Sequence, residues 1–209
     1  MNIALIGTLA EIRMGVTLRG RDATRPDPQG SCRMIRISDI SDDGVLQSDD
    51  LLQFEPGEKI RQELFLRPGD ILFPNRGTRT TACVFDLRET NVIVGAQFFD
   101  LRETNVIVGA QFFIIRVNPN VVLPAYVAWF LRSTAAATHF NEHRKGTLVQ
   151  TLPRKDIEEL SILIPSLSRQ AAIIALDALA LQERQLSTEL ARLQSSYLQH
   201  RLHLAAATS

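Results

Sequence analysis

The sequence predicts an α+β protein: a globular domain with a mixed, twisted β-sheet and helices, followed by one long helix at the C-terminus. The first 82 residues combine short apolar runs with turns, helical spacing begins after Pro124, and no proline or glycine follows Ser168. The 209 residues are 45% apolar, which is enough for a core and excludes wholesale disorder. We expect a domain over residues 1–165 and a separate helix over residues 166–209.

Strands and turns account for the N-terminal part. Residues 32–37 alternate between apolar and polar side chains, which is typical of a half-buried strand, and an Asp-Asp-Gly turn follows at 42–44. A second strand is expected at 71–73, after the turn at 68–70. Residues 19–30 and 75–81 are polar, contain glycine or proline, and are predicted to be loops.

A perfect tandem repeat interrupts the middle of the chain. Residues 86–99 read DLRETNVIVGAQFF, and residues 100–113 repeat them without change. A solenoid needs several diverged copies, so we interpret the repeat as a recent duplication, or an error in the sequence, with no function of its own. An insertion of fourteen residues keeps each strand residue on its face. We expect one copy in the native strand and the other in an extra hairpin or loop.

Helical spacing begins at Pro124, which suits the first turn of a helix. We expect this helix to run to about residue 144 and to end at Gly146. A short turn is expected from Pro153 through Leu160, and a brief apolar strand at 161–164.

The C-terminal segment carries a heptad pattern. Apolar residues recur there at spacings of three and four, interrupted by Glu183 and His200. A helix of about 37 residues would be about 55 Å long. The pattern favours a coiled-coil seam that needs a partner; the alternative is an amphipathic helix lying on its own domain. The seam residues predicted to meet a partner are Leu176, Leu179, Leu186, Leu190, Leu193 and Tyr197.

Composition narrows the function classes. The 23 basic and 23 acidic residues balance, so a general polyanion binder is not expected. All basic residues except Lys59, Lys145 and Lys155 are arginines, which can grip phosphate or guanine in a bidentate manner, although a GC-rich genome would give the same bias. Two cysteines without metal-binding spacing indicate a reducing, cytoplasmic compartment. We expect neither a signal peptide nor a membrane span.

Catalytic motifs are not found in the sequence. It has no phosphate-binding loop, no dinucleotide fingerprint, no nucleophile elbow, and no carboxylate two residues before any lysine, as a metal-dependent nuclease would have. One literal match, HxxEH at 139–143, could in principle hold zinc through His139 and His143 with Glu142 as a base. No third ligand stands at a defined position, so we expect two solvated histidines near a helix end, where the helix dipole favours them.

The order of these features resembles the specificity subunit of type I restriction–modification systems over essentially the whole chain. The resemblance lies in the series IGTLAEIRMGVTLRG, MIRISDISDDGVL, LRPGDILFPNRGTRTTA, LPAYVAWFLRS and GTLVQTLPRKDIEELSILIPSLSRQ, followed by the heptad helix. The segment 146–170 is the most specific part. Family members usually contain two target-recognition domains, each followed by a spacer helix, and this chain is similar to one half. It also departs from the family in the duplication.

The resemblance implies a subunit without catalysis and without a cofactor of its own. It implies binding to double-stranded DNA, docking to methyltransferase subunits through the helix and, for cutting, to a restriction subunit. A half-length member is expected to form a homodimer through antiparallel C-terminal helices, to place one target-recognition domain (1–165) on each half-site, and to read a palindromic bipartite target.

DNA reading requires exposed arginines and amides on loops. The candidates are Arg19, Arg21 and Arg25 in the first loop, Asn75, Arg76, Thr78, Arg79 and Thr80 in the second, and Arg144 and Lys145 at the helix end, the last two for phosphate. Two other hypotheses stay open. One is a truncated interaction module that binds partner subunits without reading DNA, and the other is the HxxEH zinc hydrolase.

Overall fold

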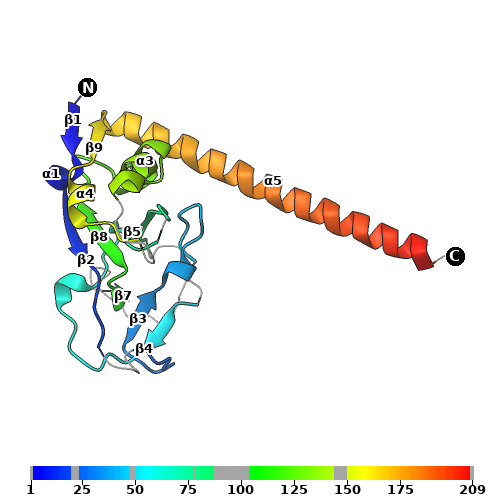
Figure 1. Ribbon diagram of the computed structural model, residues 1–209, viewed down its shortest axis with the longest axis horizontal. Coiled ribbons are helices and arrows are strands. Elements are labelled where there is room, and N and C mark those ends of the chain that lie inside the picture. Colours follow the sequence, from blue (N-terminus) through cyan, green and yellow to red (C-terminus); the bar gives the residue numbers. More distant parts are fainter. Residues whose placement is uncertain are drawn as a thin grey trace, which may run out of the picture. The chain divides into compact units, whose positions relative to one another are not determined.

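A computed structural model describes residues 2–19, 24–47, 50–77, 79–86, 104–143 and 150–207 of the chain. Contacts divide the chain into two compact units, Met1–Ala171 and Ala172–Ser209. The elements in chain order are β1 (Asn2–Leu5), α1 (Ile6–Leu9), β2 (Ala10–Met14), β3 (Cys32–Ile35), η1 (Ile37–Asp39), β4 (Leu52–Phe54), η2 (Gln62–Leu64), β5 (Ile71–Pro74), β6 (Cys83–Val84), β7 (Val106–Val108), β8 (Phe112–Val117), α2 (Pro124–Leu131), α3 (Thr134–His143), α4 (Arg154–Glu158), β9 (Ser161–Ile164) and α5 (Leu167–Ala207). The predicted α+β class with a long C-terminal helix is confirmed (Figure 1).

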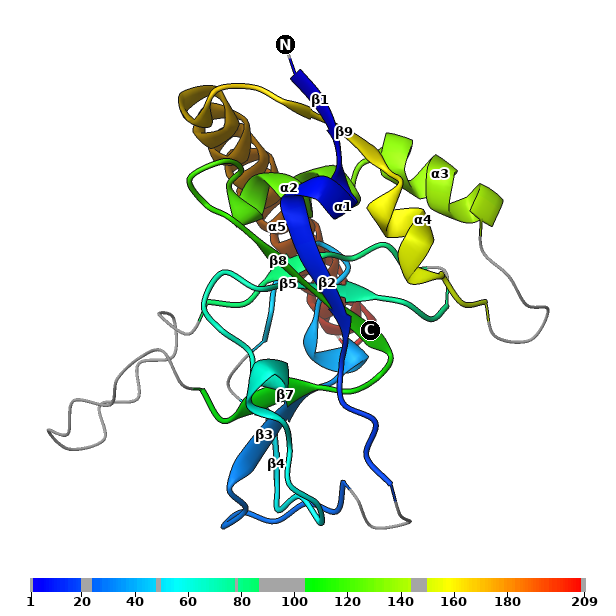
Figure 2. The same ribbon diagram turned by 90° about the vertical axis from the view of Figure 1, so that its left-hand side faces the viewer.

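The described strands form three sheets within the globular unit. An antiparallel sheet has the order β2-β8-β5-β6, and a mixed sheet has the order β4-β3-β7, in which β3 and β7 run parallel. The first and last strands of this unit, β1 and β9, pair antiparallel as a two-stranded ribbon. Figure 2 shows the ribbon and helices α1 to α4 toward one end of the globular unit and the β3–β4 pair at the other.

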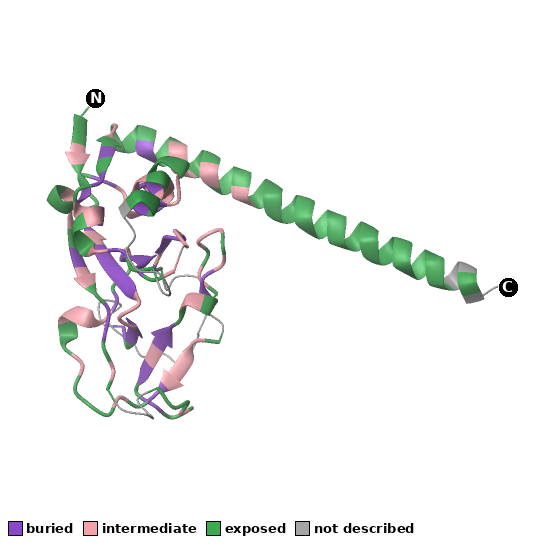
Figure 3. Ribbon diagram, viewed as in Figure 1, coloured by how far each residue is buried: buried purple, intermediate pink, exposed green. Residues whose placement is uncertain are grey.

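The core consists of two apolar clusters beside these sheets. The larger cluster joins β3, β5, β6, β7 and β8, and the smaller one lies between β3, β4 and β7 (Figure 3). All four residues of β5 are buried, and so are five of the six residues of β8. The larger cluster contains Ile35, Ile40, Leu66, Leu72, Cys83, Phe85, Val106, Val108, Phe112 and Ile114, and the smaller one Val16, Cys32, Met34, Phe54 and Ile107. Burial on this scale is the main stabilising contribution to the globular unit.

The prediction of a single helix after Pro124 is wrong in one respect, because the structure contains two helices there, α2 and α3. Ser133 separates the two: its N–H donates to the Phe130 carbonyl, and its Oγ accepts a hydrogen bond from the Ala136 N–H. A serine that bonds the backbone in this way starts a new helix. The expected end of the helix at Gly146 lies outside the described residues.

The second copy of the repeat forms β7 and supplies the first two residues of β8. Phe112 and Phe113 belong to the repeat and Ile114 to the segment after it, and all three pair with β5. If the first copy took this place, the extra residues would interrupt β8 between Phe99 and Ile114. With the second copy in place they fall between β6 and β7, where no strand is broken. Residues 87–103, and with them the expected extra hairpin or loop, lie outside the described part.

The long helix α5 contains 41 residues and begins at Leu167. Its first turn is anchored by Gln170, which is fully buried. The Gln170 Oε1 accepts a hydrogen bond of 2.8 Å from the Leu123 N–H, and its Nε2 donates one of 2.9 Å to the Pro165 carbonyl. None of the described helices combines the length and apolar character of a bilayer-spanning segment.

Candidate nucleic-acid interface

The predicted second loop leaves β5 and lies beside the segment that precedes α4. The Gly77 N–H donates to the Gln150 carbonyl, and the Leu152 N–H donates to the Asn75 carbonyl, both at 2.9 Å. Gly77 has a φ of 79°, which lies in the left-handed region that favours glycine. Two segments far apart in sequence therefore form one short antiparallel contact, which fixes the backbone on both sides of Arg76.

Arg79 holds the other side of the loop at 75–81 in place. Its Nη2 donates to the Ile40 carbonyl at 3.0 Å and to Asp42 Oδ1 at 2.6 Å, and its Nη1 donates to the Ile37 carbonyl at 3.4 Å. The guanidinium thus holds the loop to residues 37–42. Its observed contacts are within the protein, and the structure assigns it a positioning role that the sequence did not indicate.

The sequence predicted Asn75 to be an exposed residue that contacts DNA, and the structure differs. Its side chain is 5% exposed, and its Nδ2 donates to the Ala110 carbonyl at 2.9 Å. The amide therefore links the end of β5 to the β7–β8 turn. Buried amides are normally committed to such internal bonds.

Within the described part of the predicted second loop, Arg76 is exposed and Thr80 is partly exposed, and the side chain of each makes no hydrogen bond to the described chain. The exposed Gln150 and Thr151 lie next to Arg76 through the backbone contact. Sequence reasoning missed these two, because only the long-range pairing brings them together. Thr78, Arg144 and Lys145 lie outside the described residues.

The first predicted loop is attached to β4. The Asp27 N–H donates to the Gln53 carbonyl at 2.9 Å, and Gln53 Nε2 donates to the Gly30 carbonyl at 2.8 Å. Arg19 and Arg25 are both exposed and have no partner in the described chain, and Arg21 lies outside it. These contacts place Arg25 beside the β3–β4 pair, whereas Arg76 is held by the segment before α4.

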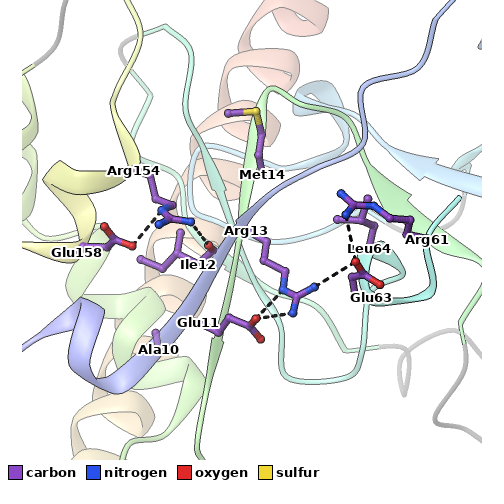
Figure 4. A pocket seen from close by; sticks show the side chains of 10 residues that line it. All are labelled: Ala10, Glu11, Ile12, Arg13, Met14, Arg61, Glu63, Leu64, Arg154 and Glu158. Atoms are coloured by element: carbon purple, nitrogen blue, oxygen red, sulfur yellow. Dashed lines mark hydrogen bonds and ion pairs between the residues drawn. The ribbon is translucent and has the colours of Figure 1, made fainter.

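A polar pocket of about 540 Å³ lies between β2, η2 and α4 (Figure 4). Three arginines line it, and each has a glutamate partner: Arg13 with Glu11 and Glu63, Arg61 with Glu63, and Arg154 with Glu158. The Arg13 guanidinium donates to Glu11 and lowers the pKa of that carboxyl. Because the positive charges are paired, this pocket is less suited to phosphate than the unpaired Arg19, Arg25 and Arg76.

Helix α5 exposes the whole predicted seam (Figure 3). The exposed fractions are 67% for Leu176, 62% for Leu179, 64% for Leu186, 57% for Leu190, 52% for Leu193 and 61% for Tyr197. An apolar row of this length on one helix is typical of a surface that packs against another helix.

The zinc hypothesis finds no support in the described residues. His139 Nε2 lies 3.0 Å from the Asp156 carbonyl oxygen, and since that oxygen only accepts, Nε2 donates and cannot also bind zinc. The side chain of His143 lies outside the described part. Within the described part, no group of three or more His, Cys, Asp or Glu side chains could hold a metal ion.

Comparison with known proteins shows which solved structures share this fold. The sequence matches no protein-family model and no curated protein. Structurally, the chain is similar to the S subunit of a type I restriction–modification system from M. genitalium, with a TM-score of 0.51 and 14% identity over 90% of this chain and 40% of that one. It is also similar to the HsdS subunit from Thermoanaerobacter tengcongensis, with a TM-score of 0.56 and 14% identity over 87% of this chain and 37% of that one.

A third structure, described as the basis of complex assembly and conformational transition of the type I R-M system, gives a TM-score of 0.56 and 15% identity over 93% of this chain and 41% of that one. The resemblance found in the sequence is thus confirmed at the level of the fold. The chain has the fold of type I specificity subunits and spans about two fifths of the length of the structures that it matches.

Proposed function

We propose that the chain is a DNA sequence-recognition subunit of a type I restriction–modification system and carries out no catalysis itself. The observation that carries the proposal is the fold shared, over about nine tenths of this chain, with two type I specificity subunits and with a third structure from a type I R-M system. The pattern of side chains supports it, since the described part holds exposed arginines on anchored loops.

The chain acts as a homodimer in this proposal. Its single globular unit reads one half-site, and two copies joined through antiparallel α5 helices read a bipartite palindrome. Methyltransferase subunits, and a restriction subunit where cutting occurs, dock on the paired helices. The exposed apolar row of α5 supports an association of this kind.

Reading is assigned to the loop at 75–80 and its neighbour at 150–151. Arg76, Thr80, Gln150 and Thr151 have the donors and acceptors that distinguish base edges in the major groove. Their backbone is fixed by Arg79 and by the pairing with residues 150–152, so the side chains are presented at low entropic cost. Arg19 and Arg25 are assigned to phosphate contacts, as are Arg144 and Lys145.

The test is methylation mapping of plasmid DNA in cells that express the chain with a type I methyltransferase subunit. We expect methylation at one bipartite palindromic motif. Arg76→Ala should lower in vitro affinity for that motif about tenfold to a hundredfold, the range for a lost base contact. Arg61→Ala is the matched control, because Arg61 is an exposed arginine already paired with Glu63.

Three other outcomes of these experiments would change the proposal. Assembly with the methyltransferase subunit but no motif would identify the chain as an interaction module that does not read DNA. A larger loss for Arg61→Ala than for Arg76→Ala would move the reading surface to the pocket of Figure 4. Absence of both assembly and DNA binding would overturn the proposal.

A further inference from the structure

The apolar row of α5 contains two polar interruptions, Glu183 and His200. Both occupy seam positions of the heptad pattern, at the spacing set by Leu176, Leu179 and Leu186. Both are exposed, and neither has a hydrogen-bond or ion-pair partner in the described chain. A polar residue at a seam position commonly decides which register a coiled coil adopts, because an unmatched charge there loses water without gaining a partner.

Antiparallel pairing of two α5 helices allows several registers that keep seam residues opposite one another, and three successive ones bring Glu183 opposite Leu186, Leu193 or His200. The register that places Leu176 opposite Leu193 also places Glu183 opposite Leu186. The two Glu183 residues then lie only about 4.5 Å apart along the axis, at 1.5 Å per residue. Two like charges this close to the two-fold axis repel each other.

The next register places Leu186 opposite Leu190. Here Glu183 faces Leu193 and His200 faces Leu176, so all four polar seam residues of the dimer lack a polar partner. A parallel pair is no better, because equivalent positions meet and Glu183 faces its own copy.

The third register matches the polar residues. Leu190 lies opposite the partner's Leu193, Leu186 lies opposite the partner's Tyr197, and Glu183 lies opposite the partner's His200. The partner's Arg201 and His203 flank this position, so a basic end of one helix faces the acidic residue of the other. The two-fold axis repeats the arrangement, which gives two Glu–His pairs per dimer.

We propose that a second copy of this chain covers the apolar row of α5 in this register, with Glu183 of each copy paired to His200 of the other. The inference rests on the proposed homodimer and adds its alignment. The Glu–His pair determines the register, because it stabilises one alignment and makes the two neighbouring ones unfavourable.

Disulfide formation between paired cysteines tests the register in the full chain. Leu186→Cys with Tyr197→Cys should give a covalent dimer under mild oxidation, because the proposed register is the only antiparallel one that places these positions opposite each other. The two cysteines are eleven residues apart on one helix, so they cannot bond within a chain. Burial raises the pKa of the native Cys83 thiol to about 12 and also raises that of Cys32, so neither interferes.

Two matched pairs report the other registers. Among the antiparallel registers, Leu179→Cys with Leu190→Cys links only in the first, and Leu179→Cys with Tyr197→Cys only in the second. A parallel pair would link every double-cysteine variant through its equivalent positions. Tyr197→Cys alone links only in a parallel pair. A covalent dimer from Tyr197→Cys alone would show a parallel pair, and one from either Leu179→Cys variant without one from Leu186→Cys with Tyr197→Cys would show another antiparallel register. Either result would overturn the register while leaving the homodimer intact. A monomeric mass for the unmodified chain, with no covalent dimer from any variant, would instead overturn the homodimer.

Replacing Glu183 by leucine gives a second test, because the registers differ in whether this change raises or lowers the dissociation constant of the dimer. In the proposed register Glu183→Leu leaves His200 facing an apolar side chain and should weaken the dimer about tenfold, while Glu183→Leu with His200→Leu should restore the dissociation constant to within about threefold of the original. In either neighbouring register Glu183→Leu would tighten the dimer, because it removes a charge that faces a leucine. Sedimentation equilibrium measures all three dissociation constants.

Discussion

The globular unit and helix α5 differ in where their large apolar side chains lie. Phe54, Phe73 and Phe112 in the globular unit are 0% exposed, whereas Leu176 and Leu202 on α5 are 67% and 70% exposed. Burying a side chain of this size contributes about 1.5–3 kcal/mol. The globular unit therefore gains its stability within one chain, and the leucines of α5 gain a comparable contribution only when another surface covers them.

This difference separates two kinds of substitution. A change in the globular core should lower the free energy of unfolding of a single chain, and a change in the α5 seam should instead alter association.

Phe73→Ala should lower the free energy of unfolding by about 3–5 kcal/mol, the range for removing a buried phenylalanine. The Phe73 ring packs against Phe140 on α3, with ring centroids 5.1 Å apart, so the change also loosens the contact between β5 and that helix. Urea denaturation at a concentration where the chain is monomeric measures the effect. Leu190→Ala is the control, and a loss above about 1 kcal/mol in that variant would contradict the separation.

Asp70→Asn should lower the free energy of unfolding by about 2–3 kcal/mol. Asp70 is 1% exposed and accepts two hydrogen bonds of 2.7 Å from the Nε and Nη2 atoms of Arg116. This contact raises the pKa of the Arg116 guanidinium, and removing the carboxylate leaves that partly buried charge without its partner. Denaturant midpoints would report the loss, and Asp42→Asn, at an exposed ion pair, should cost less than about 1 kcal/mol.

Gln170→Leu should cost about 1–3 kcal/mol, because it leaves the Leu123 N–H and the Pro165 carbonyl without their hydrogen bonds. The effect belongs to the globular unit although Gln170 lies on α5. Gln185→Leu is the matched control on the same helix, since Gln185 is exposed. Equal changes in thermal midpoint for the two variants would show that the first turn of α5 is not anchored as described.

Local patterns in the sequence were sufficient for much of the fold. Alternation and turns located β3, β5 and β9, and the heptad pattern located α5. The break between α2 and α3 was missed, because Ser133 interrupts an otherwise continuous helical pattern and serine is tolerated inside helices. The sequence alone did not show which of the two identical copies forms β7. The answer depends on which copy leaves β8 unbroken, and this requires knowledge of the whole sheet.

The candidate site was less predictable for the same reason. Arg76 and Arg79 lie three residues apart in one polar loop, and nothing local distinguishes them. The structure shows that Arg79 binds the carbonyls of Ile37 and Ile40, while Arg76 stays exposed beside Gln150. Which arginine is committed to the protein depends on partners about forty residues or more away, and composition carries no information on them.

Deletion of residues 86–99 is expected to have the smallest effect. The two ends of the β6–β7 connection are held close together, because the Gly69 N–H donates to the Phe85 carbonyl at 2.8 Å and the Thr104 hydroxyl donates to the Leu66 carbonyl. After the deletion, residues 100–103 would connect them, and an extended segment of that length reaches about 16 Å. We expect the free energy of unfolding to change by less than about 1 kcal/mol, with a small gain because fewer residues join β6 to β7.

Equivalent substitutions in the two copies provide the control for this deletion. Val108→Asp places a charge at a fully buried position of β7 and should cost more than about 3 kcal/mol, whereas Val94→Asp changes the corresponding residue of the first copy and should cost almost nothing. Equal losses in urea denaturation would mean that both copies contribute to the core. A small loss for both would mean that either copy can form β7, and that the interruption of β8 which favours the second copy costs little.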